Sequence, residues 1–150
     1  MIRTDTEYRR ALDRLREEAE TLRVQRDHLD GLGLTSEEVD RAMQPMISFH
    51  AQLEEEVDAY TRMRRGDLGP LRSLTAIGRW LVGARIARGL SQAELAERLD
   101  VDPSQVSHDE QNDYRGITVD RAQRIMEALG VRFKAEAESL LPTNDEAEYA

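Results

Sequence analysis

Residues 81–130 read LVGARIARGLSQAELAERLDVDPSQVSHDEQNDYRGITVDRAQRIMEALG, and this stretch decides the fold. Ser91 and Glu94 stand three residues apart in the S-x-x-E pattern of a capping box, which opens a helix. Asp102 and Pro103 start a second helix, because Asp is a favoured N-cap and Pro is tolerated at the first helical position. Two helices joined by so short a turn predict a helix-turn-helix. The buried side of the first helix is expected to consist of Ala93, Leu95, Ala96 and Leu99.

The second helix is expected to run from Pro103 to about Glu110, with Val106 as its one committed apolar residue. Its other side chains are polar and can form hydrogen bonds. A short helix with a single apolar anchor and an adaptable polar face suits the major groove of DNA.

The same residues resemble the Cro and phage-repressor type of helix-turn-helix, the XRE family. The resemblance rests on residues 85–89, on LSQAELA at 90–96, on VDPSQVS at 101–107, on Glu110 and on Ala-Leu-Gly at 128–130. It covers roughly residues 74–132 and implies a five-helix, lambda-repressor-like domain that binds a double-stranded DNA operator.

The resemblance also implies which residues contact DNA. Gln92 matches a glutamine that holds the phosphate backbone, a contact that fixes register without reading sequence. Pro103 lies at the tip of the recognition helix, and the positions that face the groove are Ser104, Gln105, Ser107 and His108. Further backbone contacts are expected from Gln111, Asn112 and Arg115. Arg85 and Glu110 match two positions that form an ion pair beneath the motif.

The N-terminal part predicts a helical hairpin. Capping boxes at Thr4 with Glu7 and at Thr35 with Glu38 start two helices, and Gly31 and Gly33 end the first. Apolar residues recur every three or four positions on both helices, at Tyr8, Leu12, Leu15, Ala19 and Leu22, then at Val39, Met43, Met46, His50, Leu53, Val57 and Tyr60. Pro45 predicts a kink or break. Because both stripes are narrow, the hairpin should pack on the helix-turn-helix, on its own copy or on another protein.

The chain is therefore expected to be all-α and to divide at a Gly- and Pro-containing linker, residues 66–70. Residues 1–68 form a separable hairpin for oligomerisation or partner binding, residues 69–134 the DNA-binding domain, and residues 135–150 an acidic, largely disordered tail. A helix from about residue 71 or 73 to 88 should turn Leu74, Ile77, Leu81 and Ala84 inward, and a last helix should do so with Val119, Ala122, Ile125 and Leu129. Residues 131–137 alternate as a short strand would, with a helical continuation as the alternative.

Charge is the feature that opposes DNA binding. The chain carries a formal net charge of −9 at pH 7. Residues 72–134 hold ten basic and nine acidic side chains, so the acidity lies outside the proposed DNA-binding domain. Three carboxylates nevertheless surround the recognition helix, at Asp102, Asp109 and Asp113, where the family more often has neutral or basic residues. Asp102 is explained as an N-cap, whereas the sequence offers no explanation for Asp109.

Catalysis is not expected. The chain has no cysteine, and the pairing of His50 with Glu54 offers only two ligands, which do not make a metal site. No Gly-rich phosphate loop and no nucleophile with a paired base are present. We expect no cofactor and no metal. No apolar run is long enough to span a membrane and no signal peptide is recognised, so a cytoplasmic protein is expected.

These features predict a sequence-specific, dimeric transcriptional regulator that acts as a repressor. The N-terminal helices and the run L-x-x-A-R-I-A-R-G-L-S-Q resemble the layout of HigA-like antitoxins, which neutralise a toxin and repress their own operon. A cognate toxin would then be a second partner. One alternative is a plain repressor whose N-terminal helices dimerise or sense a signal. Another is an interaction protein that keeps the fold without binding DNA tightly. The sequence does not name the operator, the effector or the partner.

Overall fold

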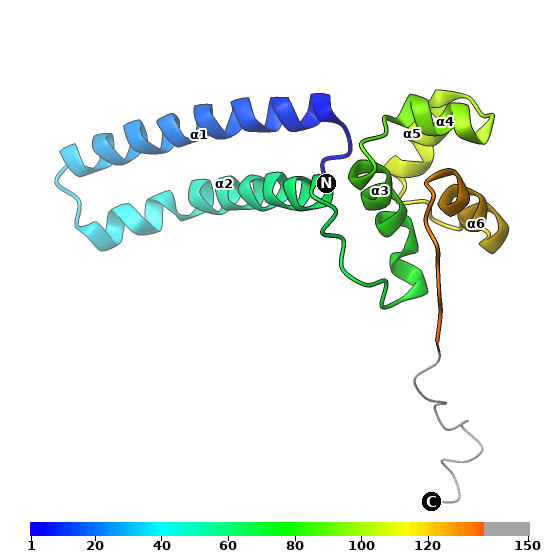
Figure 1. The fold of residues 1–150 in the computed structure, drawn as a ribbon. Coiled ribbons are helices and arrows are strands. Elements are labelled where there is room, and N and C mark those ends of the chain that lie inside the picture. The colour runs from blue at the N-terminus through cyan, green and yellow to red at the C-terminus, as the bar shows by residue number, and fades with distance from the viewer. Residues whose placement is uncertain (137–150) are drawn as a thin grey trace, which may run out of the picture.

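The computed structural model describes residues 1–136, and over that range the chain is all-helical, as predicted. The α-helices are α1 (Asp5–Gly31), α2 (Ser36–Arg64), α3 (Ile77–Ala87), α4 (Gln92–Leu99), α5 (Pro103–Gln111) and α6 (Val119–Ala128), and a 3₁₀ helix, η1 (Leu74–Ala76), precedes α3. Figure 1 shows α1 and α2 side by side as a hairpin that extends away from the group formed by α3 to α6.

Both predicted starts of the hairpin helices are confirmed. The Thr4 hydroxyl accepts a hydrogen bond from the Glu7 backbone at 3.2 Å, and the Thr35 hydroxyl accepts one from Glu38 at 3.3 Å. The predicted break at Pro45 does not occur, because α2 continues through it as one helix. Pro45 therefore removes one backbone hydrogen bond without ending the helix.

The hairpin is joined to the rest of the molecule by one continuous core. Ile2, Val57 and Tyr60 are buried in the same cluster as Leu81 of α3 and Ile125 of α6. The hairpin therefore packs on the helix-turn-helix part of the chain, which is one of the three partners expected for it. The near end of the hairpin contributes to this shared core, so removing residues 1–68 would expose part of it.

The far end of the hairpin has a different character. Val39 and Met43 are fully buried but are not part of the shared core. They lie at the end of the hairpin where α2 packs only against α1. Large apolar side chains are exposed in this half, including Val24, Leu32 and Phe49. The far end thus stands clear of the molecule, as Figure 1 shows.

Three residues expected to face the core are exposed instead. Leu74 is 75% exposed, Val119 is 84% exposed, and Ala93 is exposed as well. Each lies in the first turn of its helix, η1, α6 and α4 respectively. An apolar pattern marks one face of a helix but does not show where along that face a neighbouring helix lies, so these residues fit the pattern without having a packing partner.

The short strand expected at residues 131–137 is absent from 131–136, which form neither helix nor strand. A strand needs a partner strand, and the described part of the chain offers none. Residue 137 and the predicted disordered tail from there to 150 lie outside the described residues.

Candidate nucleic-acid interface

The helix-turn-helix consists of α4, a three-residue turn and α5. The Ser91 hydroxyl accepts from the Glu94 backbone at 3.1 Å, and the Ser91 backbone donates to the Glu94 carboxylate at 2.7 Å, which completes the predicted capping box. Asp100 ends α4 in the left-handed conformation at φ 55°. The Asp102 carboxylate then accepts from the Ser104 backbone at 2.8 Å and opens α5. Local capping therefore sets both ends of the turn.

The structure exposes the polar side of α5 and buries its inner side. Val106 is 1% exposed and Glu110 is completely buried. The candidate DNA-reading residues lie outside, with Ser107 half-buried and the following exposed: Pro103, Ser104, Gln105, His108, Gln111, Asn112 and Arg115. These residues thus form one accessible polar surface along α5 and the loop after it.

An ion pair lies directly beneath this surface. Arg85 of α3 binds Glu110 of α5 through two parallel hydrogen bonds, Nε to Oε1 at 2.6 Å and Nη2 to Oε2 at 2.7 Å. The two side chains are 3% and 0% exposed. A bidentate pair of this kind fixes angle as well as distance, so it holds α5 against α3 in one orientation.

Gln92 is engaged in the same cluster. Its side-chain amide donates to Glu110 Oε2 at 2.9 Å, and the residue is half-buried. Gln92 was expected to reach outward to a phosphate. In the DNA-free chain its Nε2 instead donates one hydrogen bond to the buried carboxylate. The second N–H of that amide and the free backbone N–H groups at the start of α4 can still donate to a phosphate.

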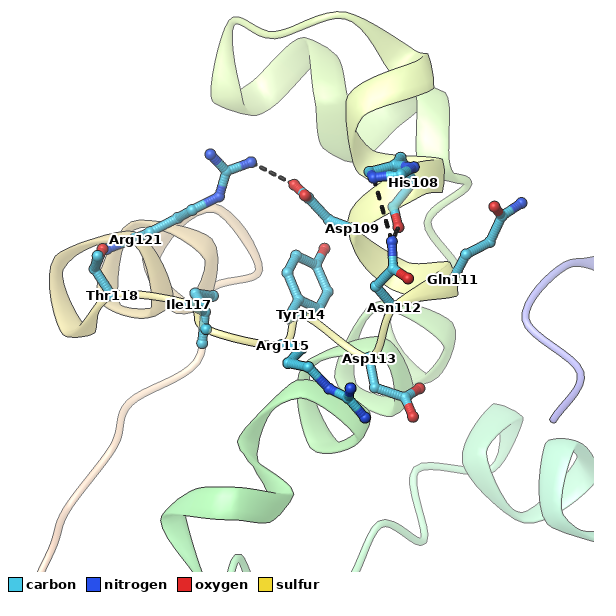
Figure 2. Close-up of a pocket in the computed structure, with 11 residues that line it drawn as sticks. His108, Asp109, Gln111, Asn112, Asp113, Tyr114, Arg115, Ile117, Thr118 and Arg121 are labelled. Carbon is cyan, nitrogen blue, oxygen red and sulfur yellow. Dashed lines mark hydrogen bonds and ion pairs between the residues drawn. The ribbon is translucent and has the colours of Figure 1, made fainter.

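The unexplained Asp109 has a partner from α6. Its carboxylate forms an ion pair with the Arg121 guanidinium, drawn as a dashed line in Figure 2. When the Gln105 amide is oriented so that its oxygen faces Arg121, that oxygen accepts from both terminal nitrogens at 3.0 and 3.2 Å. Arg121 therefore ties two residues of the recognition helix to α6. The sequence could not show this, because Asp109 and Arg121 lie on different helices.

The other two carboxylates are also satisfied. The hydroxyl and backbone of Ser104 donate to Asp102 and lower the pKa of that carboxyl. Burial on its own would raise the pKa of Asp113, but Arg79 and Arg3 each bind this carboxylate at 3.0 Å, and the net effect is a lowered pKa. Each acid that seemed to oppose DNA binding is thus bonded to groups of the protein itself.

The loop after α5 contains a buried residue that the sequence did not reveal. Tyr114 is 5% exposed, and both Asp113 and Tyr114 adopt positive φ, at 51° and 50°. The loop lies so close to α3 that a Cβ on Gly78 would be 1.8 Å from the Asp113 carbonyl oxygen. Burial, and then the Glu110 charge, raise the pKa of the Tyr114 phenol. The loop therefore follows one fixed path from α5 to α6.

A polar cavity of about 580 Å³ opens beside the recognition helix. Figure 2 shows its lining residues, which come from the C-terminal half of α5, the loop and the start of α6. The His108 ring and the Asn112 amide nitrogen lie 3.2 Å apart on its rim. The concave surface is continuous with the exposed polar face of α5.

Comparison with known proteins agrees with this architecture. Residues 83–134 match a family model described as Helix-turn-helix. This part of the chain, which contains α4 and α5, is therefore similar to helix-turn-helix domains, a class of DNA-binding domain. The N-terminal hairpin lies outside the match. No curated protein and no solved structure matches the chain.

Within residues 1–136, no cluster of three or more His, Asp or Glu side chains is arranged to hold a metal ion. None of the helices in that range combines the length and the apolar character needed to cross a membrane.

Proposed function

We propose that the protein is a sequence-specific, DNA-binding transcriptional regulator that binds its operator as a dimer and represses transcription. The observation that carries the proposal is the exposed polar face of α5, held in one orientation by the buried pair of Arg85 and Glu110. A recognition helix needs both an accessible hydrogen-bonding surface and a rigid support behind it.

The side chains divide into two roles by chemistry. Once its amide oxygen is released from Arg121, Gln105 can pair with both the N6 and N7 atoms of an adenine. Ser104, Ser107 and His108 add less selective hydrogen bonds to base edges. Pro103 approaches the groove with the tip of α5. The surrounding residues bind phosphates of the DNA backbone, and these are Gln92, Gln111, Asn112 and Arg115.

Dimerisation follows from the size of the domain. A single module of this kind buries only about 600–1,000 Å² on DNA, so tight and specific binding needs two half-sites. We expect the half-sites to be related by a two-fold axis, because two copies of one chain present the same recognition helix.

The test begins with selection of bound sequences from a pool of random DNA duplexes by the purified protein. On the selected site, Gln105→Ala and His108→Ala should each cost about 1–3 kcal/mol if a base contact is lost, with affinity for unrelated DNA nearly unchanged. Gln52→Ala is the matched control, since it removes an exposed glutamine of the hairpin. Failure to enrich any sequence at low salt would favour the alternative of an interaction protein that does not bind DNA.

The antitoxin role is a more specific version of this function, and the hairpin supports it. Residues 13–58 carry thirteen acidic and five basic side chains. The same region exposes apolar side chains at Val24, Leu32 and Phe49. An acidic arm with exposed apolar groups is suited to binding a basic protein, as a cognate nuclease-like toxin would be.

Co-expression tests this role directly. A toxin partner encoded beside the gene should arrest growth when expressed alone, co-purify with the full chain and be neutralised by it. Phe49→Asp should abolish co-purification while leaving operator binding unchanged. If no neighbouring product binds, the protein is a plain repressor whose hairpin dimerises or senses a signal.

A further inference from the structure

Arg3 occupies an unusual place between the hairpin and the recognition helix. It directly precedes Thr4, the N-cap of α1, and follows Ile2, which is 6% exposed in the shared core. Its own side chain is only 18% exposed although it is an arginine close to the start of the chain. The guanidinium is therefore enclosed by protein and does not extend into solvent.

The side chain of Arg3 reaches the end of α5. Its Nη2 donates to the Asp113 carboxylate at 3.0 Å and lies 3.5 Å from the carbonyl oxygen of Gln111, the last residue of α5. The carbonyl groups at the C-terminal end of a helix have no partner within the helix and carry partial negative charge. A cation at this position stabilises both the helix end and the loop that follows it.

The backbone of Arg3 reaches the support behind α5. Its carbonyl oxygen accepts a hydrogen bond from Arg85 Nη2 at 2.8 Å, the same nitrogen that binds Glu110. One residue of the N-terminal segment therefore contacts the recognition helix in two ways, by its side chain at the C-terminal end and by its backbone through the buried ion pair.

We propose that Arg3 is a positioning residue that couples the hairpin to the recognition helix. The inference rests on the proposed DNA-binding function. Ile2 and the capped start of α1 fix Arg3 from the hairpin side, and its contacts with Asp113, Gln111 and Arg85 fix the orientation of α5. A change in the position of α1 is transmitted to the DNA-reading surface through this residue.

The first experiment compares Arg3→Ala with Arg9→Ala in the full chain. Arg9 lies on α1 with its side chain 78% exposed, so both variants lose one positive charge from the same segment. Arg3→Ala should weaken binding to the selected operator by about tenfold, the effect of losing one base contact, and leave binding to unrelated DNA unchanged. Arg9→Ala should leave both affinities unchanged. Arg3→Lys should lose less operator affinity than Arg3→Ala, because lysine keeps the positive charge but lacks the planar guanidinium with its several donors.

A direct contact of Arg3 with DNA would give a different result. Affinity for operator and for unrelated DNA would then fall together. The slope of log affinity against log salt concentration would also become shallower, by the amount expected for about one lost phosphate contact. That outcome overturns the proposal, as does an Arg3→Ala variant with the affinity of the parent protein. Asp113→Asn removes the charge that both Arg3 and Arg79 bind and tolerates the positive φ. Compared with Arg79→Ala, it repeats the test should Arg3→Ala fail to fold.

Amide hydrogen exchange in the DNA-free protein separates this inference from the proposed function. Arg3→Ala should accelerate exchange at the end of α5 and in residues 112–116 while leaving α6 protected. If the parent protein selects no DNA but this pattern is observed, the coupling stands and the proposed function fails. Unchanged exchange in α5 would overturn the coupling whatever the DNA result.

Discussion

The buried pair of Arg85 and Glu110 allows a quantitative test of the fold. Glu110→Ala would leave the Arg85 guanidinium buried without its carboxylate, a change that typically costs about 3–5 kcal/mol. Two carbonyl oxygens, of Leu90 at 2.6 Å and of Arg3 at 2.8 Å, remain as acceptors for Arg85. We therefore expect the lower part of that range for Glu110→Ala.

Arg85→Ala should be the more damaging of the two single variants. It removes the donor from both carbonyl oxygens and leaves Glu110 fully buried with only the Gln92 amide as partner at 2.9 Å. For a chain of this size, 1 kcal/mol corresponds to about 2–4 °C in the unfolding midpoint, so a loss of about 3–5 kcal/mol lowers it by about 6–20 °C.

A double-mutant cycle measures how strongly the pair is coupled. Urea unfolding followed by circular dichroism should show that Arg85→Ala combined with Glu110→Ala costs less than the sum of the single variants, by at least about 1 kcal/mol. Arg121 and Asp109 form the control pair, since their side chains are 39% and 25% exposed and a coupling of about 0–1 kcal/mol is expected there. Additive effects at Arg85 and Glu110, within about 0.5 kcal/mol, would refute the view that this pair supports α5.

Gly78→Ala should destabilise the protein by about 1–3 kcal/mol in thermal unfolding and weaken operator binding, because the added methyl group would displace the loop at Asp113; an unchanged midpoint would mean that the loop moves freely. The lowered pKa of Asp113 predicts a contribution to stability that is present above the pKa of the unfolded chain, about 3.9, and is lost as the pH falls below it. Urea unfolding from pH 6 to pH 2 should therefore show a smaller acid-induced loss in Asp113→Asn than in the parent. Pro45→Ala should raise stability by up to about 3 kcal/mol, because α2 already continues through this exposed position; a destabilised variant would show that the proline matches the backbone there. Removing residues 1–68 should give a fragment without a cooperative unfolding transition, since Ile2, Val57 and Tyr60 leave the shared core; a sharp transition would show that α3 to α6 fold alone.

The local parts of the fold could be predicted from the sequence. Each capping box spans only four residues, so Thr4, Thr35 and Ser91 identified helix starts without any knowledge of tertiary structure. The polar exposed face of α5 followed from the single apolar anchor Val106 in the same way.

The parts that failed depend on contacts between distant residues. Leu74 and Val119 continue the apolar pattern of their helices, yet the pattern carries no information on where the neighbouring helix ends. Tyr114 is buried only because Gly78, 36 positions earlier, lets the loop approach α3. Asp109 has its partner on α6, and a carboxylate without a visible neighbour in sequence is easily mistaken for a repulsive group.

The role of Arg3 was also beyond the sequence. Its contact with Asp113 spans 110 positions, and an arginine near a chain end normally lies in solvent.

The length of the hairpin affects how much DNA the protein would cover. At about 1.5 Å per residue, the 27 residues of α1 span about 40 Å. Duplex DNA rises about 3.4 Å per base pair, so an arm of this length equals about one helical turn. Because the arm is acidic, the duplex would repel it, but a bound protein would still occupy space beyond the bases that α5 contacts. Competition with a neighbouring DNA-bound protein would depend on the direction in which this arm lies, and not only on the spacing between the two recognition sequences.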